Sequence, residues 1–269
     1  MKKIFIAVAI AAVAMSSLAH APFTAPSNYV VNGDNTSILA GFAEHPFDSE
    51  VAIRGFDFQV VNPKGESTPL TFSNTASLSS ANVESKLDGT YQIIGQRSAA
   101  IQYVKDGKRW LRVLDARGAN VPPLSERDFI LPTEITTQQQ KLDVTRVVRL
   151  LSFFSKYQHS DLVAVNMQSG LNFNYSLHPN LIKTGQTLGL SVKLKQKAAA
   201  GYQVLVERQH SSLTDKTEPL KLVTNAQGVV NIPFKLAGQY ILTVSSPETK
   251  EYAKPEAETY RSFLSIYVN

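Results

Sequence analysis

The chain has 269 residues, of which 43% are hydrophobic and 18% are charged, and it contains no cysteine. This composition excludes a disordered chain, a disulfide framework, a thiolate metal site and a cysteine nucleophile. The net charge of +5 comes from 27 Lys and Arg against 22 Asp and Glu, and so small an excess argues against a nucleic-acid-binding protein.

The N-terminal residues 1–19 are predicted to be a secretory signal peptide. Lys2 and Lys3 precede an apolar run, Ile4–Met15, and small residues follow it. The run is too short to cross a bilayer as a helix, and no later segment has the length and apolar character that a span requires. We therefore expect a periplasmic protein that does not span the membrane.

Two cleavage sites fit the requirement for small residues, one after Ala19 and one after Ala21. Cleavage after Ala21 would leave Pro22 at the new N-terminus, and the proline ring constrains the bond to be cut. We favour cleavage after Ala19. The mature chain would then start at His20 with a net charge of +3, because two lysines leave with the signal peptide.

Residues 20–166 are predicted to form an N-terminal β-sandwich domain. The turn pair Asp106-Gly107 predicts a two-residue hairpin whose ribbon runs on to Leu114. The segment Asn120–Gln140 is rich in Pro, Thr and Gln and predicts a long loop or connector. The remaining candidate strands of this half are Asn28–Val31, Ser37–Phe42, Phe56–Val61, Thr90–Gln96 and Ala100–Val104.

The segment Asp143–Tyr157 fits two kinds of structure. Its apolar residues recur at helical spacing, whereas its Val, Thr and Phe content suits a strand. Periodicity does not distinguish the two, and both stay open. No other segment predicts an amphipathic helix, so the protein is expected to be mainly β.

Residues 167–269 are predicted to form a C-terminal β-sandwich domain. In Thr187–Lys195, apolar and polar residues alternate with the period of a strand that buries one face. Turn residues separate similar segments along this half. The predicted fold class is therefore all-β, with two β-sandwich domains in tandem. The similar segments are 171–177, 230–234, 240–244 and 260–268.

The order and spacing of short motifs over the mature chain resemble a family of exported bacterial two-domain β-proteins, the domain of unknown function 4198 family. The motifs are His20-Ala21-Pro22-Phe23, Ala40–Glu50, Phe58–Gly65, Gly89-Thr90-Tyr91, Lys108-Arg109-Trp110, Gly170-Leu171, His178-Pro179-Asn180, Gly185–Leu188, Thr224–Gly228 and Gly238-Gln239-Tyr240.

Members of that family have often been labelled periplasmic components of nickel or cobalt transport. The resemblance therefore implies a periplasmic protein associated with a metal ion, with an envelope metal transporter or receptor as its partner. The C-terminal half also resembles the carboxypeptidase regulatory-like and prealbumin-like sandwiches, a fold with many functions. The two domains are accordingly expected to be immunoglobulin-like or prealbumin-like.

His20 is a candidate metal ligand on chemical grounds. As the first residue it would offer both its α-amine and its imidazole to one divalent ion of Cu, Ni, Co or Zn. A third ligand would be needed, and we expect it from His45 or His178; His159 lies in no site-like pattern. The other candidate donors are His210 and the oxygens of Glu44, Asp48 and Glu50.

Each of these residues also has a plainer interpretation. A histidine after a signal peptide can be incidental, and the acidic stretch around His45 can be a solvated loop. His178-Pro179-Asn180 can be a turn between domains. No pair of histidines at metal-binding spacing supports the site.

Two other kinds of activity have weaker support. No nucleophile elbow, phosphate loop or dinucleotide-binding motif occurs, so we expect no enzyme. A basic hairpin with aromatic residues could grip an anionic glycan, or its charges could protect an edge strand from pairing. Its residues are Tyr103, Lys105, Lys108, Arg109, Trp110 and Arg112.

Two functions therefore stay open. The first is a periplasmic accessory that captures a divalent transition-metal ion for an envelope transport system, with His20, His45 and His178 as ligands. The second is a non-catalytic β-sandwich interaction module that binds glycan or protein without a metal.

Overall fold

A computed structural model describes residues 21–116, 121–163, 170–210, 217–247 and 253–269. These residues form strands and two single-turn 3-10 helices, η1 (Leu124–Glu126) and η2 (Pro132–Glu134). The prediction of an all-β protein is confirmed.

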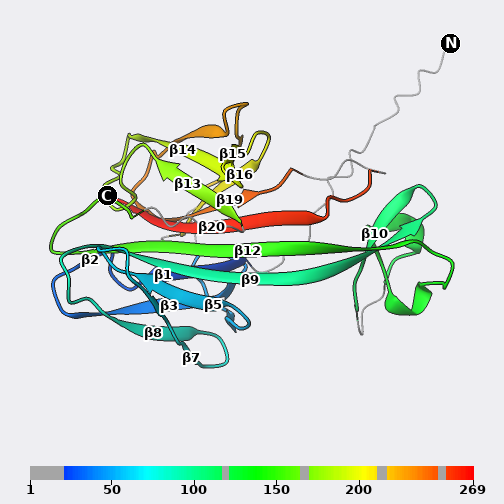
Figure 1. Cartoon of the computed structure of the whole chain (residues 1–269), viewed down its shortest axis with the longest axis horizontal. Helices are drawn as coiled ribbons and strands as arrows, with labels where there is room; N and C mark the ends of the chain where they lie inside the picture. Colours follow the sequence, from blue (N-terminus) through cyan, green and yellow to red (C-terminus); the bar gives the residue numbers. More distant parts are fainter. Residues whose placement is uncertain (1–20, 117–120, 164–169, 211–216, 248–252) are drawn as a thin grey trace, which may run out of the picture.

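An eleven-stranded central sheet runs through the whole molecule (Figure 1). Two strands at its middle, β12 (Lys141–Lys156) and β20 (Glu258–Val268), are parallel to each other. The main path of the sheet continues on both sides of this pair. Its other strands are β11 (Phe129–Ile130), β10 (Arg109–Val113) and β9 (Gly89–Asp106) on one side and β19 (Gly238–Ser245), β16 (Gln203–Arg208) and β17 (Leu220–Val223) on the other. Off this path lie β2 (Val30–Val31), which pairs with β12, and β5 (Asp57–Val61), which pairs with β9 and β6 (Ser67–Pro69).

A smaller sheet packs on each face of the central sheet, as Figure 1 shows below and above β12. We call them the N-terminal and C-terminal sheets. The N-terminal sheet consists of β1 (Ala21–Pro26), β3 (Asn35–Ala43), β4 (Val51–Ala52), β7 (Ser73–Asn74) and β8 (Ser79–Glu84). The C-terminal sheet consists of β13 (Leu171–Tyr175), β14 (Thr187–Leu194), β15 (Lys197–Ala198) and β18 (Val229–Pro233).

Each face of the central sheet has its own hydrophobic core. Along β12, Leu150 and Phe154 point into the core beneath the N-terminal sheet, whereas Leu151 and Phe153 point into the core beneath the C-terminal sheet. Because both faces are buried, the strand has no simple alternation of apolar and polar residues. This resolves the open alternative for Asp143–Tyr157 in favour of a strand.

The two predicted domains share this central sheet. β12 belongs to the predicted N-terminal domain and β20 to the C-terminal one, yet Thr145 to Ser152 pair with Glu258 to Ser265. Phe263 of β20 also packs in the core beneath the N-terminal sheet. The predicted boundary between residues 166 and 167 lies outside the described residues.

Several strands differ from their predicted extents. The two candidates at Thr90–Gln96 and Ala100–Val104 form one continuous strand, β9. The strand β1 was not among the predicted strands, because its sequence contains Pro22 and Pro26, which disfavour a central strand. β1 lies at the end of its sheet, where prolines are tolerated.

The strands β9 and β10 extend beyond both smaller sheets into a lobe, at the right in Figure 1. The predicted hairpin is present, with Asp106 paired to Arg109 around Gly107. The segment predicted as a long loop contributes η1, β11 and η2 to this lobe. A small separate core of Val104, Leu111 and Ile130 holds it together.

Candidate functional site

His45 and His210 form an exposed pair of imidazoles. Their ring centroids lie 5.8 Å apart, although the residues come from the turn after β3 and the end of β16. The turn that carries His45 is fixed by Phe47, which has a φ of 66° and packs its ring edge-on against Phe23 of β1. Two histidines from distant segments therefore meet on one surface.

A carboxyl group lies on the same side of the sheet as this pair. Glu207, three residues before His210, is half-buried, and burial raises the pKa of its carboxyl. The nearby charges of Arg261 and His45 act in the opposite direction on that pKa. Glu207 is thus close enough to His45 for their charges to interact.

The start of β1 lies beside the turn that carries His45. Ala21 pairs with Ala43, two residues before His45. The predicted ligand His20 precedes Ala21 in the sequence and lies outside the described residues. Within the described part of the chain, no three His, Asp or Glu side chains are grouped closely enough to hold a metal ion.

His178, the other predicted ligand, lies in a different polar cluster, next to His159. Their ring centroids are 5.2 Å apart. Nε2 of His178 lies 3.0 Å from Oγ1 of Thr90, and Nδ1 of His159 lies 2.9 Å from Oγ of Ser155. Thr90 and Ser155 are themselves 3.0 Å apart through their hydroxyl oxygens. The cluster joins β9 and β12 to the segment between β13 and β14.

The hydrogen bonds of His178 indicate which tautomer its neutral imidazole adopts. Its Nδ1 accepts the backbone N–H of Asn180 at 3.1 Å, so that nitrogen carries no proton. Its proton lies on Nε2, toward Thr90. Burial and then the neighbouring His159 lower the pKa of His178. Both nitrogens of this imidazole are used within the fold, which fits the turn interpretation better than a ligand.

A cavity of about 460 Å³ lies between the central sheet and β13. The guanidinium of Arg149, which is 3% exposed, lines it and donates to the carbonyl oxygen of Leu171 at 2.5 Å and to Oε1 of Gln96 at 3.1 Å. Burial lowers the pKa of Arg149 to about 10. These bonds tie the start of the C-terminal segment to β12, so Arg149 has a structural role.

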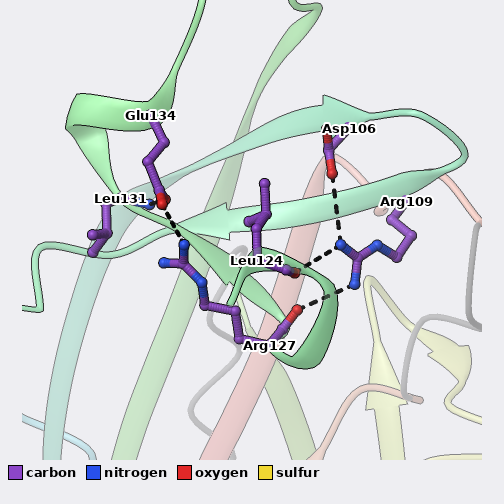
Figure 2. A network of polar contacts seen from close by, with 6 residues as sticks. All are labelled: Asp106, Arg109, Leu124, Arg127, Leu131 and Glu134. Atoms are coloured by element: carbon purple, nitrogen blue, oxygen red, sulfur yellow. Dashed lines mark hydrogen bonds and ion pairs between the residues drawn. The ribbon is translucent and has the colours of Figure 1, made fainter. Parts of the chain in front are cut away.

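The basic hairpin uses one of its arginines within the lobe (Figure 2). Arg109 donates to the carbonyl oxygens of Leu124 at 2.9 Å and Arg127 at 3.3 Å, and it pairs with Asp106 at 3.6 Å. The buried Arg127 pairs in turn with Glu134. Arg109 is therefore not available to a partner in the way that the sequence interpretation required.

Sequence reasoning missed Glu207 and the meeting of His45 with His210. His210 was an alternative third ligand, but no local pattern relates it to His45, 165 positions earlier. No motif surrounds Glu207 either. The packing of the N-terminal sheet on the central sheet brings these residues together, since β3 and β16 belong to different sheets.

The family model of a domain of unknown function, DUF4198, matches residues 17–248. The chain belongs to the DUF4198 family. The resemblance noted from the motifs is thereby confirmed, whereas the nickel or cobalt label attached to such proteins stays a prediction. No relative was found among curated proteins.

Solved structures are similar to this DUF4198 protein at low identity. A DUF4785 family protein from Legionella pneumophila has 11% identity and a TM-score of 0.23, covering 82% of this chain and 51% of its own. The chain thus spans about half the length of that protein. The FN1–FN3 domains of chicken CNTN1 have 10% identity and a TM-score of 0.23, covering 93% and 100%. The D0–D1 domain of intimin has 10% identity and a TM-score of 0.22, covering 91% and 97%.

Proposed function

We propose that this DUF4198 protein is a periplasmic binding protein that captures a divalent transition-metal ion at the pair of His45 and His210. The observation that carries the proposal is the approach of these two imidazoles, 5.8 Å between ring centroids, on the surface beside the start of β1. The meeting of two exposed histidines from segments far apart in the sequence supports the proposal, because one ion could bridge such a pair.

The donor set suits the ions expected from the sequence. Imidazole nitrogen is a strong ligand for Zn, Cu and Ni, and Glu207 adds an oxygen donor near His45. A positive ion would also favour the ionised form of Glu207, which its burial disfavours. Binding is therefore expected to weaken as the pH falls and the ligands become protonated.

In this proposal the mature N-terminus completes the site. Cleavage after Ala19 would leave His20 with a free α-amine, and Ala21 pairs with Ala43 close to His45. The amine and imidazole of His20 would then add two nitrogen ligands. His178 is left out of this site because its ring nitrogens bond to Thr90 and Asn180.

The proposed role is binding and delivery, without catalysis. An envelope metal transporter or receptor would take the ion from the site, whose exposure permits such a transfer. Among the described residues, no helix has the length and apolar character needed to cross a membrane.

The test is to purify the exported protein, determine its first residue by intact mass, and titrate it with Cu(II), Ni(II), Co(II) and Zn(II) by calorimetry. We expect one ion to bind per chain, and we expect His45→Ala and His210→Ala each to weaken binding by about tenfold or more. The matched control is the pair of variants His159→Ala and His178→Ala, which removes imidazoles from the other cluster.

Three outcomes would contradict the proposal. The first is that the parent protein binds none of the four ions. The second is that the control variants lose binding while His45→Ala and His210→Ala retain it. The third is a mature chain that starts at Pro22, which would contradict the part of the proposal in which His20 completes the site.

A further inference from the structure

Three arginines from neighbouring strands point to the face of the central sheet that packs against the N-terminal sheet. Val148 of β12 pairs with Arg97 of β9 on one side and with Arg261 of β20 on the other. Directly paired residues point to the same face of a sheet, and Val148 packs against the core beneath the N-terminal sheet. Arg146, two residues from Val148 on the same strand, also points to this face.

A fourth arginine extends the group into the lobe. Arg112 of β10 is paired with Tyr103 of β9, and the side chain of Tyr103 is hydrogen-bonded to Arg146. Arg112 is also close enough to Arg146 to act on its charge. We call Arg97, Arg112, Arg146 and Arg261 the arginine strip.

The positive charges of the strip repel one another. Burial lowers the pKa of Arg146, and the charge of Arg112 lowers it further. Burial also lowers the pKa of Arg261, and the charge of Arg146 lowers it further. Glu207 acts against this effect at Arg261, and Tyr103 acts against it at Arg146. Arg97 is exposed, and the other three side chains are half-buried. A ligand that supplied negative charge would relieve this repulsion.

We infer that the arginine strip binds a linear acidic polysaccharide through its carboxylate or sulfate groups. The strip spans β10, β9, β12 and β20, which are successive neighbours in the sheet. Its arginines lie at different levels along these strands, because Arg112 is paired with Tyr103, six residues along β9 from Arg97. A ligand that meets all four arginines therefore carries several anions along its length. The planar guanidinium groups are suited to paired hydrogen bonds with such anions.

This inference goes beyond the proposed metal site and does not depend on it. It also moves the proposed glycan-binding surface from the basic hairpin to the arginine strip. In the hairpin, Arg109 donates a hydrogen bond to the carbonyl oxygen of Leu124 within the lobe. Arg112, by contrast, lies close enough to Arg146 for their charges to interact.

The test is to measure binding of a sulfated dextran to the full chain by calorimetry, with neutral dextran as the reference polymer. The strip variant is Arg97→Gln with Arg112→Gln, because these side chains are the least committed to packing. The control variant is Lys183→Gln with Lys197→Gln, which removes the same charge from exposed positions beside the C-terminal sheet. We expect the strip variant to bind about tenfold more weakly and the control variant about as tightly as the parent.

Arg146→Gln is a second variant, in which thermal unfolding is measured together with binding. The inference is supported if it keeps its thermal midpoint and loses affinity. It is overturned if the parent binds no sulfated dextran, if both double variants lose affinity equally, or if single-stranded DNA of matched charge binds as tightly as the polysaccharide. Metal titration of the strip variant should be unchanged, which separates this inference from the proposed metal site.

Discussion

Gly170 lies directly against Arg149: a Cβ added at Gly170 would be 2.7 Å from Nη2 of that arginine. Gly170 also has a φ of 97°, a backbone conformation that other residues rarely adopt. It is the residue from which the chain enters β13, and Arg149 holds the next carbonyl oxygen, that of Leu171.

We expect Gly170→Ala to lower the free energy of unfolding by about 1–3 kcal/mol. The added Cβ would disfavour the positive φ of this residue and would displace the buried guanidinium of Arg149. Urea unfolding measures the change. Gly33→Ala is the matched control, since a Cβ at Gly33 would meet no atom within 4 Å. Equal stability of the two variants would show that the contact with Arg149 is unimportant.

Phe153 and Phe154 test whether the two cores unfold together. They are adjacent on β12, and both are nearly inaccessible to solvent, but they belong to cores on opposite faces of the central sheet. We expect Phe153→Ala and Phe154→Ala each to destabilise the whole protein by about 3–5 kcal/mol, with one unfolding transition. Circular dichroism and tyrosine fluorescence should report the same midpoint. Two separated transitions in either variant would contradict this expectation.

His178 should make the fold sensitive to acid. Its pKa is lower in the folded protein than the ordinary value of 6.5, so the unfolded chain binds a proton more readily than the folded one. Stability from this group is complete at a pH well above 6.5 and is lost as the pH falls below that value and through the folded pKa. Protonation would place a second N–H against that of Asn180, while Asp161 favours the charged form and His159 opposes it.

The measurement is the thermal midpoint between pH 8 and pH 5, chosen to bracket the ordinary histidine pKa of about 6.5. His178→Asn should show a smaller decrease than the parent, because it cannot be protonated. His210→Asn removes an exposed histidine and should behave like the parent. An unchanged acid dependence in His178→Asn would assign the effect to other groups.

Glu134 is expected to hold the lobe together. It pairs with the buried Arg127 and accepts the backbone N–H of Leu131 at 2.9 Å. Glu134→Ala should increase amide hydrogen exchange across residues 124–134 and leave the smaller sheets protected, because the lobe has its own small core. Glu126→Ala, at an exposed position in the same lobe, is the charge-matched control. Similar exchange in both variants would argue against this role.

The strands with one buried face could be predicted from the sequence, and so could β20, whereas β12 could not be distinguished from a helix. β14 alternates between buried and accessible residues, and its predicted extent is close to the observed one. β12 buries both faces, so its apolar residues gave no period of two. The edge strand β1 was not predicted, because its two prolines disfavour a strand assignment.

The two histidines of the candidate site were predictable as single residues but not as a pair, and Glu207 was not predictable. His45 and His210 were both candidates as single histidines, yet their contact depends on how the turn after β3 meets the end of β16. The sequence favours His178 over His159 as a ligand, yet the two imidazoles lie next to each other. Local sequence carries no information on such long-range contacts, because they are fixed by the pairing and packing of the sheets.

The position of β20 has a consequence for how the chain is made. It is the last strand in chain order, yet it lies between β12 and β19, and Phe263 and Leu264 fill the two different cores. Neither face of the central sheet can therefore be completed until the last strand is available. A chain that is made in the order of its sequence would therefore stay without a finished core until β20 is available, and a protease or chaperone would meet it in that state.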